Sequence, residues 1–251
     1  MMRGEVPTIS AITICRNSAS TIERALQSVT RSSYPKLQYV IVDGASTDGT
    51  LDVIARYRAH VAKLVSEPDS GISEALNKAI ALSDGEYHII VHADDELLPG
   101  TLERLGEAAR SGEAEVVCGT ALVVAHDGRV VRIFRPEPAK LLQKMSIPHM
   151  GALIRRAAWE AVGGYDVRRR IAMDHHFMLK ILRRYGPTAF KCVDHAVARY
   201  SLGGVSDRQV MRGFRELRQN LIEAGVGKLH AYGAYGVLVC KARVSRLIRR
   251  T

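Results

Sequence analysis

Residues 37–50 read LQYVIVDGASTDGT, an apolar run that ends in an aspartate and a glycine-containing turn. The run from Leu37 to Val42 is short and rich in β-branched residues, which is typical of a buried strand. Asp43 follows the strand directly, and the next six residues have the chemistry of a loop that precedes a helix. A strand that leads through a polar loop into a helix is the repeating unit of a parallel α/β sheet.

The same unit recurs through the first hundred residues. Strands are predicted over residues 9–15, near 63–66 and over 87–92. A capping box formed by Ser20 and Glu23 predicts the start of a first helix. The apolar faces of the predicted helices are Ile22, Ala25, Leu26 and Val29, and later Ile72, Ala75, Leu76, Ala79 and Ile80. We therefore expect a Rossmann-like α/β domain with a mainly parallel sheet that is flanked by helices.

The pattern changes beyond residue 112. Residues 116–124 and 129–134 flank a His-Asp-Gly turn, which predicts a hairpin that extends the sheet with antiparallel strands. A short helix is expected over 157–162, a loop over 163–166 and a longer helix over 173–185.

Acidic residues follow three of the predicted strands. Asp43 ends one strand, Asp69 lies just beyond the next, and Asp94 and Asp95 follow a third. Ligands of open α/β sheets bind at the carboxyl ends of the strands. Two adjacent carboxylates repel each other unless a cation or hydrogen-bond donors offset the charge. Carboxylates suit Mg²⁺ or Mn²⁺, ions that often complete their shell with substrate phosphates.

Each of these residues also has an ordinary structural interpretation. Asp95 would cap a helix that begins near Pro99, with Asp94 in solvent, and Asp43 and Asp48 would be turn residues. Asn77 falls near the apolar side of its helix, where an amide needs a partner, and a ligand is one candidate. The repeated placement at strand ends favours a binding site.

Composition excludes several classes of protein. The chain has 251 residues, 47% of them hydrophobic, which supports one full-sized core and argues against disorder. The four cysteines are far apart in the sequence and lack the spacing of a zinc site or a disulfide framework, so we expect free thiols in a reducing cytosol. No signal peptide or membrane-spanning run is recognised. We expect a cytoplasmic protein, with peripheral attachment to the inner face of the membrane left open.

The net charge of +10 is concentrated late in the chain. Residues 207–251 hold ten basic and three acidic residues, a local net of +7. One stripe of the predicted helix here is apolar and another is basic: Val210, Phe214, Leu217 and Leu221 on the first, Arg208, Arg212, Arg215 and Arg218 on the second. A basic amphipathic helix of this kind binds anionic membrane surfaces. The alternative is an ordinary helix with a solvated face, packed on the domain.

A series of short motifs along the chain resembles glycosyltransferase family 2. The series comprises Asn17, residues 42–50, Glu67-Pro-Asp-x-Gly71, Ala75-x-Asn-Lys78, Gly85-Glu-Tyr, His92-Ala-Asp-Asp95, Pro148-His149, Arg155-Arg156, Gly163-Gly-Tyr-Asp166, Met173-Asp-His175 and Gly203-Gly-Val-Ser206. The resemblance covers about residues 8–206. It implies a GT-A fold in a domain of residues 1–206, followed by a basic helical extension of residues 207–251.

The resemblance also implies roles for individual residues. Nucleotide-sugar contacts would fall on Thr13, Asn17, Asp43, Asp69, Asn77, Lys78 and Asp94. The metal, Mn²⁺ or Mg²⁺, would bind Asp95 and Asp94, although His92 occupies the place of the first aspartate in the family's Asp-x-Asp motif. Asp174 would be the general base. His149, Gly164 and His175 would contact the acceptor or the diphosphate, while an isolated histidine is otherwise often a packed, hydrogen-bonded side chain.

The chemistry of sugar transfer requires such parts. A departing nucleoside diphosphate gains negative charge that a divalent ion stabilises, and the attacking hydroxyl must lose its proton to a nearby carboxylate. Direct displacement by the acceptor inverts the anomeric carbon, so one base suffices. We expect a UDP-, dTDP- or GDP-sugar as donor and a glycan or glycolipid as acceptor.

Two other classes of function compete with this interpretation. A nucleotidyltransferase also uses paired carboxylates and a metal, but it would need a glycine-rich loop after the first strand, where this chain has Arg16-Asn-Ser-Ala-Ser. A catalytically silent nucleotide-sugar-binding or nucleic-acid-binding module is supported mainly by the net charge. Aromatic residues are not interleaved with the early basic ones, so we expect no nucleic-acid partner.

Overall fold

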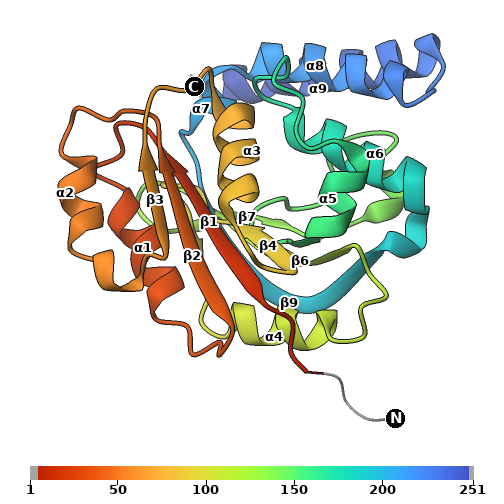
Figure 1. Ribbon diagram of the computed structural model, residues 1–251. Helices are drawn as coiled ribbons and strands as arrows, with labels where there is room; N and C mark the ends of the chain where they lie inside the picture. Colours follow the sequence, from red (N-terminus) through yellow and green to blue (C-terminus); the bar gives the residue numbers. More distant parts are fainter. Residues whose placement is uncertain (1–4, 249–251) are drawn as a thin grey trace.

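The computed structural model describes the backbone of residues 5–248 and the side chains of residues 5–240. Within this part, nine strands form one mixed sheet in the order β3-β2-β1-β4-β8-β6-β9-β5, with β7 paired to β6 (Figure 1). Helices flank the sheet. The expected α/β class, with a mixed and mostly parallel sheet, is confirmed.

The first half of the chain builds the parallel part of the sheet. Its strands are β1 (Ile9–Cys15), β2 (Leu37–Asp43), β3 (Lys63–Ser66) and β4 (Tyr87–Ile90). The connecting helices are α1 (Ile22–Thr30), α2 (Thr50–Ala55) and α3 (Ile72–Leu82), with a short 3₁₀ turn at Arg58–His60. Strand β1 pairs in parallel with both β2 and β4, and β2 pairs with β3. The carboxyl ends of these four strands therefore share one edge of the sheet.

The second half adds the remaining strands, some of them antiparallel. They are β5 (Glu96–Leu97), β6 (Val116–Val124), β7 (Val130–Phe134), β8 (Leu153–Arg155) and β9 (Phe190–Ser201). The helices are α4 (Thr101–Ala109), α5 (Arg156–Val162) and α6 (Met173–Tyr185), with 3₁₀ turns at Pro138–Lys140 and Pro187–Ala189. The predicted hairpin is confirmed as the antiparallel pair β6–β7. Strand β9 returns to lie parallel to β6.

Apolar residues cover both faces of the sheet. One buried cluster joins β1, β2 and β4 to α1, α2 and α4, and the other joins the same strands to α3, α5 and α6. Alternate residues of β1 explain the two clusters, because Ile9 and Ala11 face the first and Ile12 and Ile14 face the second. The sheet is thus a buried middle layer, and its exposed edges are where polar loops can gather.

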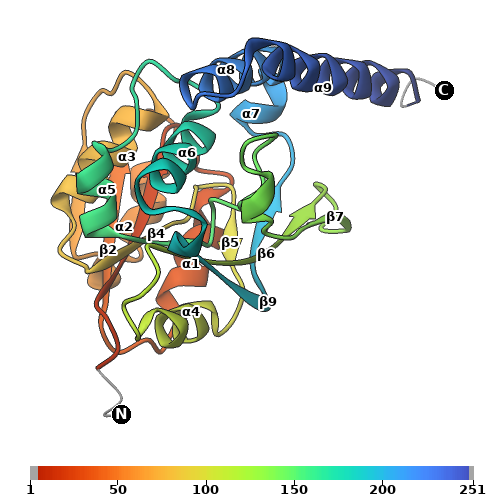
Figure 2. The same ribbon diagram turned by 90° about the vertical axis from the view of Figure 1, so that its right-hand side faces the viewer.

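Three C-terminal helices follow β9. They are α7 (Val205–Arg208), α8 (Val210–Glu223) and α9 (Lys228–Ile248). Figures 1 and 2 show α8 and α9 side by side along one end of the molecule, beyond α6. A small core of Leu217, Leu221 and Ala231 includes Ala172, just before α6. The proposed boundary at residue 206 stays a prediction, and the basic side chains from Lys241 onward lie outside the described ones.

Several local expectations differ from the structure. Helix α1 has Thr21 as its N-cap and no side-chain capping bond, so the predicted Ser20–Glu23 capping box is wrong. Backbone N–H groups of Thr21 and Ile22 instead donate to the carbonyl of Ser18. The cysteines are free, as expected, yet Cys118 and Cys192 lie 3.8 Å apart on the paired strands β6 and β9. Strand pairing brings together residues that sequence spacing separates.

Candidate functional site

Asp43 lies at the carboxyl end of β2, fully buried and surrounded by donors. Its carboxylate accepts hydrogen bonds from the backbone N–H of Ser46 at 2.9 Å, the hydroxyl of Ser66 at 2.6 Å and the hydroxyl of Ser46. The Cys15 thiol donates at 3.5 Å. Burial alone would raise the pKa of Asp43, but these hydrogen bonds hold it below its usual value, so the group is ionised.

The loops after β1 and β2 are joined by hydrogen bonds. Asn17 accepts a hydrogen bond from the Thr47 N–H at 2.9 Å, and its own N–H donates to the Ser46 hydroxyl at 2.8 Å. In the described part of the chain, Asn17 and Ala45 are the non-glycine residues with positive φ, 50° and 56°. An alanine in this region is strained by about 1–2 kcal/mol. Such strain clusters at ligand-binding loops, which supports a site at this edge.

Asp69 and Lys78 lie at the same edge. A Cβ added to Gly44 would overlap Asp69 Oδ2, so this carboxylate lies directly against the backbone that follows Asp43. Asp69 also accepts a hydrogen bond from the Gly71 N–H at 2.8 Å, just before α3. Lys78, farther along α3, is ion-paired with Glu67, which raises its pKa.

Asp94 and Asp95 follow β4 on the other side of β1. Asp95 is 2% exposed, and its Oδ1 accepts a hydrogen bond from the Ser201 N–H at 2.9 Å. Burial and the neighbouring Asp94 raise the pKa of Asp95 well above its usual value. The next helix, α4, begins at Thr101 with Gly100 as its N-cap, so the interpretation of Asp95 as a cap is wrong. A Cβ at Gly204 would come within 3.1 Å of Asp94 Oδ2, which places the loop after β9 against this pair.

The surroundings of Asp95 fit a divalent cation. Its Oδ2 is buried without a hydrogen-bond partner among the described residues, although a buried carboxylate oxygen normally has one. The described residues contain no group of three or more His, Cys, Asp or Glu side chains that could hold a metal by themselves. Mg²⁺-type sites need only one or two carboxylates when substrate phosphates complete the shell. Asp95 and Asp94 can therefore supply the protein side of such a shell.

Asp174 is the second residue of α6 and is partly exposed. Its carboxylate accepts a hydrogen bond from the His175 N–H at 2.7 Å. Burial raises the pKa of Asp174 to about 6, despite the hydrogen bonds that lower it. A carboxylate whose pKa lies near neutrality is suited to accept a proton. Burial and, after it, the charge of Asp174 raise the pKa of Tyr165 well above its usual value.

The loop before α6 is held by polar groups of α3 and by a histidine. Asn77 makes two hydrogen bonds with the backbone of Tyr165, at 2.8 and 2.9 Å, so its amide has a partner in the protein, and its predicted contact with the nucleotide-sugar stays a prediction. The Tyr165 hydroxyl is 2.7 Å from Nε2 of His149. Burial, His92 and His88 lower the pKa of His149 to about 3, so it is neutral. Gly164, at φ 64°, packs against Asn77 and Trp159.

Two predicted site residues lie in the interior. The Thr13 hydroxyl donates to the Val91 carbonyl at 2.9 Å and contacts the Tyr39 hydroxyl at 2.8 Å. His175 is fully buried, with Nε2 2.9 Å from the carbonyl of Leu141. Direct ligand contacts by Thr13 and His175 stay predictions, and these internal bonds do not support them.

Several of the other predicted residues lie at the carboxyl ends of the parallel strands or near the start of α3, and their roles stay predictions. Asp43 and Asp95 follow strands on either side of β1, and the loop before Asp174 contacts the start of α3, where the Ser73 hydroxyl donates to the Arg169 carbonyl at 3.0 Å. Sequence reasoning missed Ser46 and Ser66, which complete the Asp43 site, because a serine in a loop or at the end of a strand carries no distinctive pattern. A hollow of about 460 Å³ lies between α3 and α5 and is lined in part by Asn77, Lys78 and Trp159.

The parallel half-sheet, its antiparallel extension and the acidic residues at the strand ends define a GT-A-like α/β fold. Sequence comparison then identifies the family. The family sequence model described as Glycosyl transferase family 2 matches residues 10–177. The chain therefore belongs to that family of glycosyltransferases. The resemblance seen in the sequence is confirmed.

Curated relatives that are named as glycosyltransferases agree with this assignment. The chain is 27% identical over 240 residues to an uncharacterized glycosyltransferase of Mycobacterium tuberculosis H37Rv, covering 92% of this chain and 87% of the relative. It is 29% identical over 217 residues to a PGL/p-HBAD biosynthesis glycosyltransferase of Mycobacterium bovis BCG, covering 83% and 82%.

Solved structures support the fold. Staphylococcus aureus TarS (residues 1–349) in complex with UDP-GlcNAc matches with a TM-score of 0.68 at 18% identity, covering 92% of this chain and 71% of that one. The mannosyltransferase PcManGT of Pyrobaculum calidifontis, in complex with GDP-Man and Mn²⁺, matches with a TM-score of 0.65 at 20% identity, covering 96% and 76%. At these identities the likeness establishes the fold alone.

Proposed function

We propose that this glycosyltransferase moves a sugar from a nucleoside-diphosphate sugar to an acceptor hydroxyl, with inversion, using Mn²⁺ or Mg²⁺ and Asp174 as the base. The proposal is supported by an ionised Asp43 and a metal-compatible Asp95 at the ends of strands on either side of β1, and by Asp174, whose segment contacts the start of α3. A nucleotidyltransferase is not favoured, since the chain belongs to a glycosyltransferase family.

The donor side of the site is formed by the strand ends. Asp43 and Asp69 would meet the nucleoside at the loops after β2 and β3, and Asn17 braces the loop after β2. Asp95 and Asp94 would hold the divalent ion, which when bound would stabilise the negative charge of the leaving diphosphate. The bound nucleotide-sugars and Mn²⁺ of TarS and PcManGT motivate the choice of donor and metal.

The acceptor side is formed by the start of α6. Asp174 would accept the proton of the attacking hydroxyl, and its pKa of about 6 means that it is ionised at neutral pH. The neutral His149 would hold Tyr165 beside it through the contact at 2.7 Å. A single base and direct attack by the acceptor lead to inversion.

A glycolipid or lipid-linked glycan is the acceptor that we propose, with the C-terminal helices on an anionic membrane surface. The mycobacterial relative is named for PGL/p-HBAD biosynthesis. On α9, Leu229 is 90% exposed, and Tyr232 and Val237 are about half exposed. The Arg218 guanidinium lies 4.6 Å from the centre of the Tyr232 ring, so cationic and apolar groups occur together. No helix among the described residues is long and apolar enough to cross a membrane.

The reaction can be tested with a panel of UDP-, dTDP- and GDP-sugars, measuring release of the nucleoside diphosphate with and without Mn²⁺ or Mg²⁺. We expect turnover of at least one donor only with metal, and loss of turnover in Asp174→Asn while donor binding persists. Donor binding without turnover in the wild-type protein would instead favour a catalytically silent module. Metal-independent turnover would exclude the proposed role of Asp95 and Asp94.

Membrane binding is tested separately by flotation with vesicles. We expect binding to vesicles that contain phosphatidylserine, little binding to phosphatidylcholine alone, and weaker binding after Leu229→Ser and Tyr232→Ser. Equal recovery with both vesicle types would exclude recognition of anionic lipid.

A further inference from the structure

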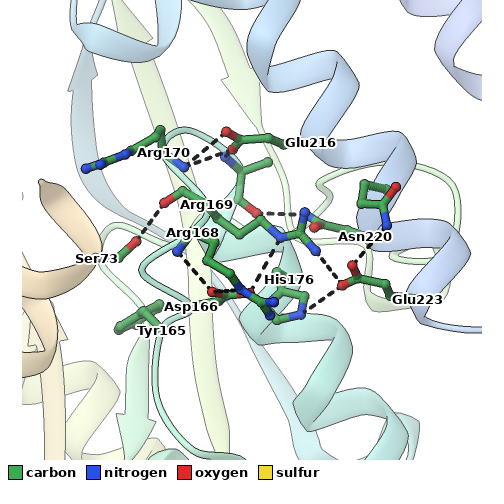
Figure 3. A network of polar contacts seen from close by, with 12 residues as sticks. Ser73, Tyr165, Asp166, Arg168, Arg169, Arg170, His176, Glu216, Asn220 and Glu223 are labelled. Carbon is green, nitrogen blue, oxygen red and sulfur yellow. Dashed lines mark hydrogen bonds and ion pairs between the residues drawn. The ribbon is translucent and has the colours of Figure 1, made fainter.

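Helix α8 contacts the segment that leads into α6 through a row of polar side chains (Figure 3). Glu216, Asn220 and Glu223 are spaced at i, i+4 and i+7, so they share one face of the helix. The apolar residues Leu217 and Leu221 lie beside them and pack against Ala172. This face is therefore turned toward the protein rather than toward solvent.

Glu216 binds the backbone just before the first turn of α6. Its Oε2 accepts hydrogen bonds from the N–H groups of Ile171 at 2.8 Å, Ala172 at 2.9 Å and Arg170 at 3.1 Å. The side chain is only 11% exposed, and Arg212 donates to Oε1 at 3.0 Å. Hydrogen bonds from N–H groups to a carboxylate are strong, and a carboxylate at a helix N-terminus also interacts favourably with the helix dipole.

The other two polar residues of this face hold the same segment. Asn220, which is fully buried, donates to the carbonyl of Ala172 at 2.8 Å. Glu223 is ion-paired with Arg169 and lies 3.5 Å from Nε2 of His176. On the opposite side, Ser73 of α3 donates to the Arg169 carbonyl. The segment from Arg169 to His176 is thus fixed between α8 and the domain.

Asp174 lies inside this segment, two residues after Ala172. We propose that α8 is a positioning element for the catalytic base, and that Glu216 fixes the N-terminus of α6 so that the Asp174 carboxylate faces the acceptor. The inference rests on the proposed role of Asp174. Glu216 lies beyond residues 10–177, the part matched by the family model, so it is a feature of this chain's C-terminal helices.

A purely structural attachment of α8 predicts a different outcome from a positioning role. The negative charge of Glu216 contributes to the raised pKa of Asp174, after the larger effect of burial. Neutralising Glu216 should therefore lower the pKa of Asp174. In a plot of kcat against pH, the fall of kcat on the acidic side (the acidic limb) should then occur at lower pH. Misplacement of the base by about 1 Å should reduce kcat by up to about 100-fold. General loosening of the fold would also hydrate Asp174 and lower its pKa, so the limb is compared with the donor KM, which general loosening would raise and misplacement of the base alone would not.

The test compares Glu216→Gln with Glu107→Gln, a matched change on α4, away from the site. The probe is nucleoside-diphosphate release from whichever of UDP-N-acetylglucosamine and GDP-mannose the wild-type protein uses. For Glu216→Gln we expect a fall in kcat of about 10- to 100-fold, an unchanged donor KM and an acidic limb at lower pH. Amide hydrogen exchange at Arg170, Ile171 and Ala172 should become faster. Glu107→Gln should match wild type in all four measurements.

A second variant covers the case in which Glu216→Gln does not fold. Glu216→Asp keeps the charge but shortens the side chain, so kcat should fall while the acidic limb stays in place. Unchanged kcat and unchanged exchange in a folded Glu216 variant would refute the inference. An active Asp174→Asn variant would refute the base assignment itself, whereas inactive Asp174→Asn with fully active Glu216 variants would refute only the role of α8.

Discussion

Replacing Asp174 by asparagine should slow transfer strongly and at the same time stabilise the protein at alkaline pH. Burial raises the pKa of Asp174 from its ordinary 3.8 to about 6, so the folded protein favours the protonated carboxyl. The stability that this group contributes is fully present below about pH 3.8 and is lost as the pH rises through about 6. A difference of about two pH units, at about 1.4 kcal/mol per unit, corresponds to up to about 3 kcal/mol above pH 7.

Asparagine removes this penalty because it carries no charge and its side-chain oxygen can still accept the His175 N–H. We expect Asp174→Asn to raise the free energy of unfolding at pH 8 by up to about 3 kcal/mol, or the melting temperature by up to about 6–12 °C. Most of the difference should disappear by pH 4. The rate of transfer should fall about 10²- to 10⁴-fold, as expected for loss of a general base.

Denaturant titrations at pH 4 and pH 8 measure the stability, with Asp194→Asn on the exposed part of β9 as the control. Nucleoside-diphosphate release measures the activity. Equal stability of Asp174→Asn and wild type at pH 8 would refute the argument that the site disfavours the charged carboxylate. A stabilised variant that remained active would keep the electrostatic argument but exclude Asp174 as the base.

Three further outcomes are expected at the same edge of the sheet. Mn²⁺ and UDP together should stabilise the wild-type protein against thermal unfolding, by about 2.7 kcal/mol when the ligand is at a hundredfold excess over its Kd. Asp95→Asn should remove this stabilisation, and a variant that retained it would exclude Asp95 as a metal ligand. Asn77→Ala should lower the free energy of unfolding, measured by chemical denaturation, by about 1–3 kcal/mol. The backbone N–H and C=O of Tyr165 would lose their hydrogen-bond partner. Asp43→Asn should weaken UDP binding, as measured by calorimetry, and lower the stability of the fold. The amide N–H₂ of asparagine would face the donor groups of Ser46 and Ser66, which now donate to the carboxylate. Wild-type affinity for UDP would contradict this expectation.

Residues near one another in the sequence carried much of the correct interpretation. The strand-loop-helix units predicted the parallel half of the sheet. The repeated acids at strand ends indicate a binding edge, which stays a prediction. Both follow from local rules, because a buried parallel strand has a continuous apolar signature and its carboxyl end adjoins the next loop. The hairpin of β6 and β7 was predictable for the same reason.

Local patterns failed where a partner comes from elsewhere in the chain. Asn77 needed a partner, and only the fold identified it as the Tyr165 backbone, 88 residues away. For Thr13 and His175, which resemblance assigned to the site, the tertiary structure adds internal hydrogen bonds, and their ligand contacts stay predictions.

The amino-acid sequence by itself determined the family, the α/β class and the acidic residues of the candidate site, since these depend on periodicity and on short motifs in a constant order. Only the tertiary structure decided which of those residues share an environment, what holds each of them, and how α8 binds the start of α6. Glu216 illustrates the physical reason. Its hydrogen bonds to Arg170, Ile171 and Ala172 join segments about 45 residues apart, and chain folding alone brings that carboxylate and those N–H groups together.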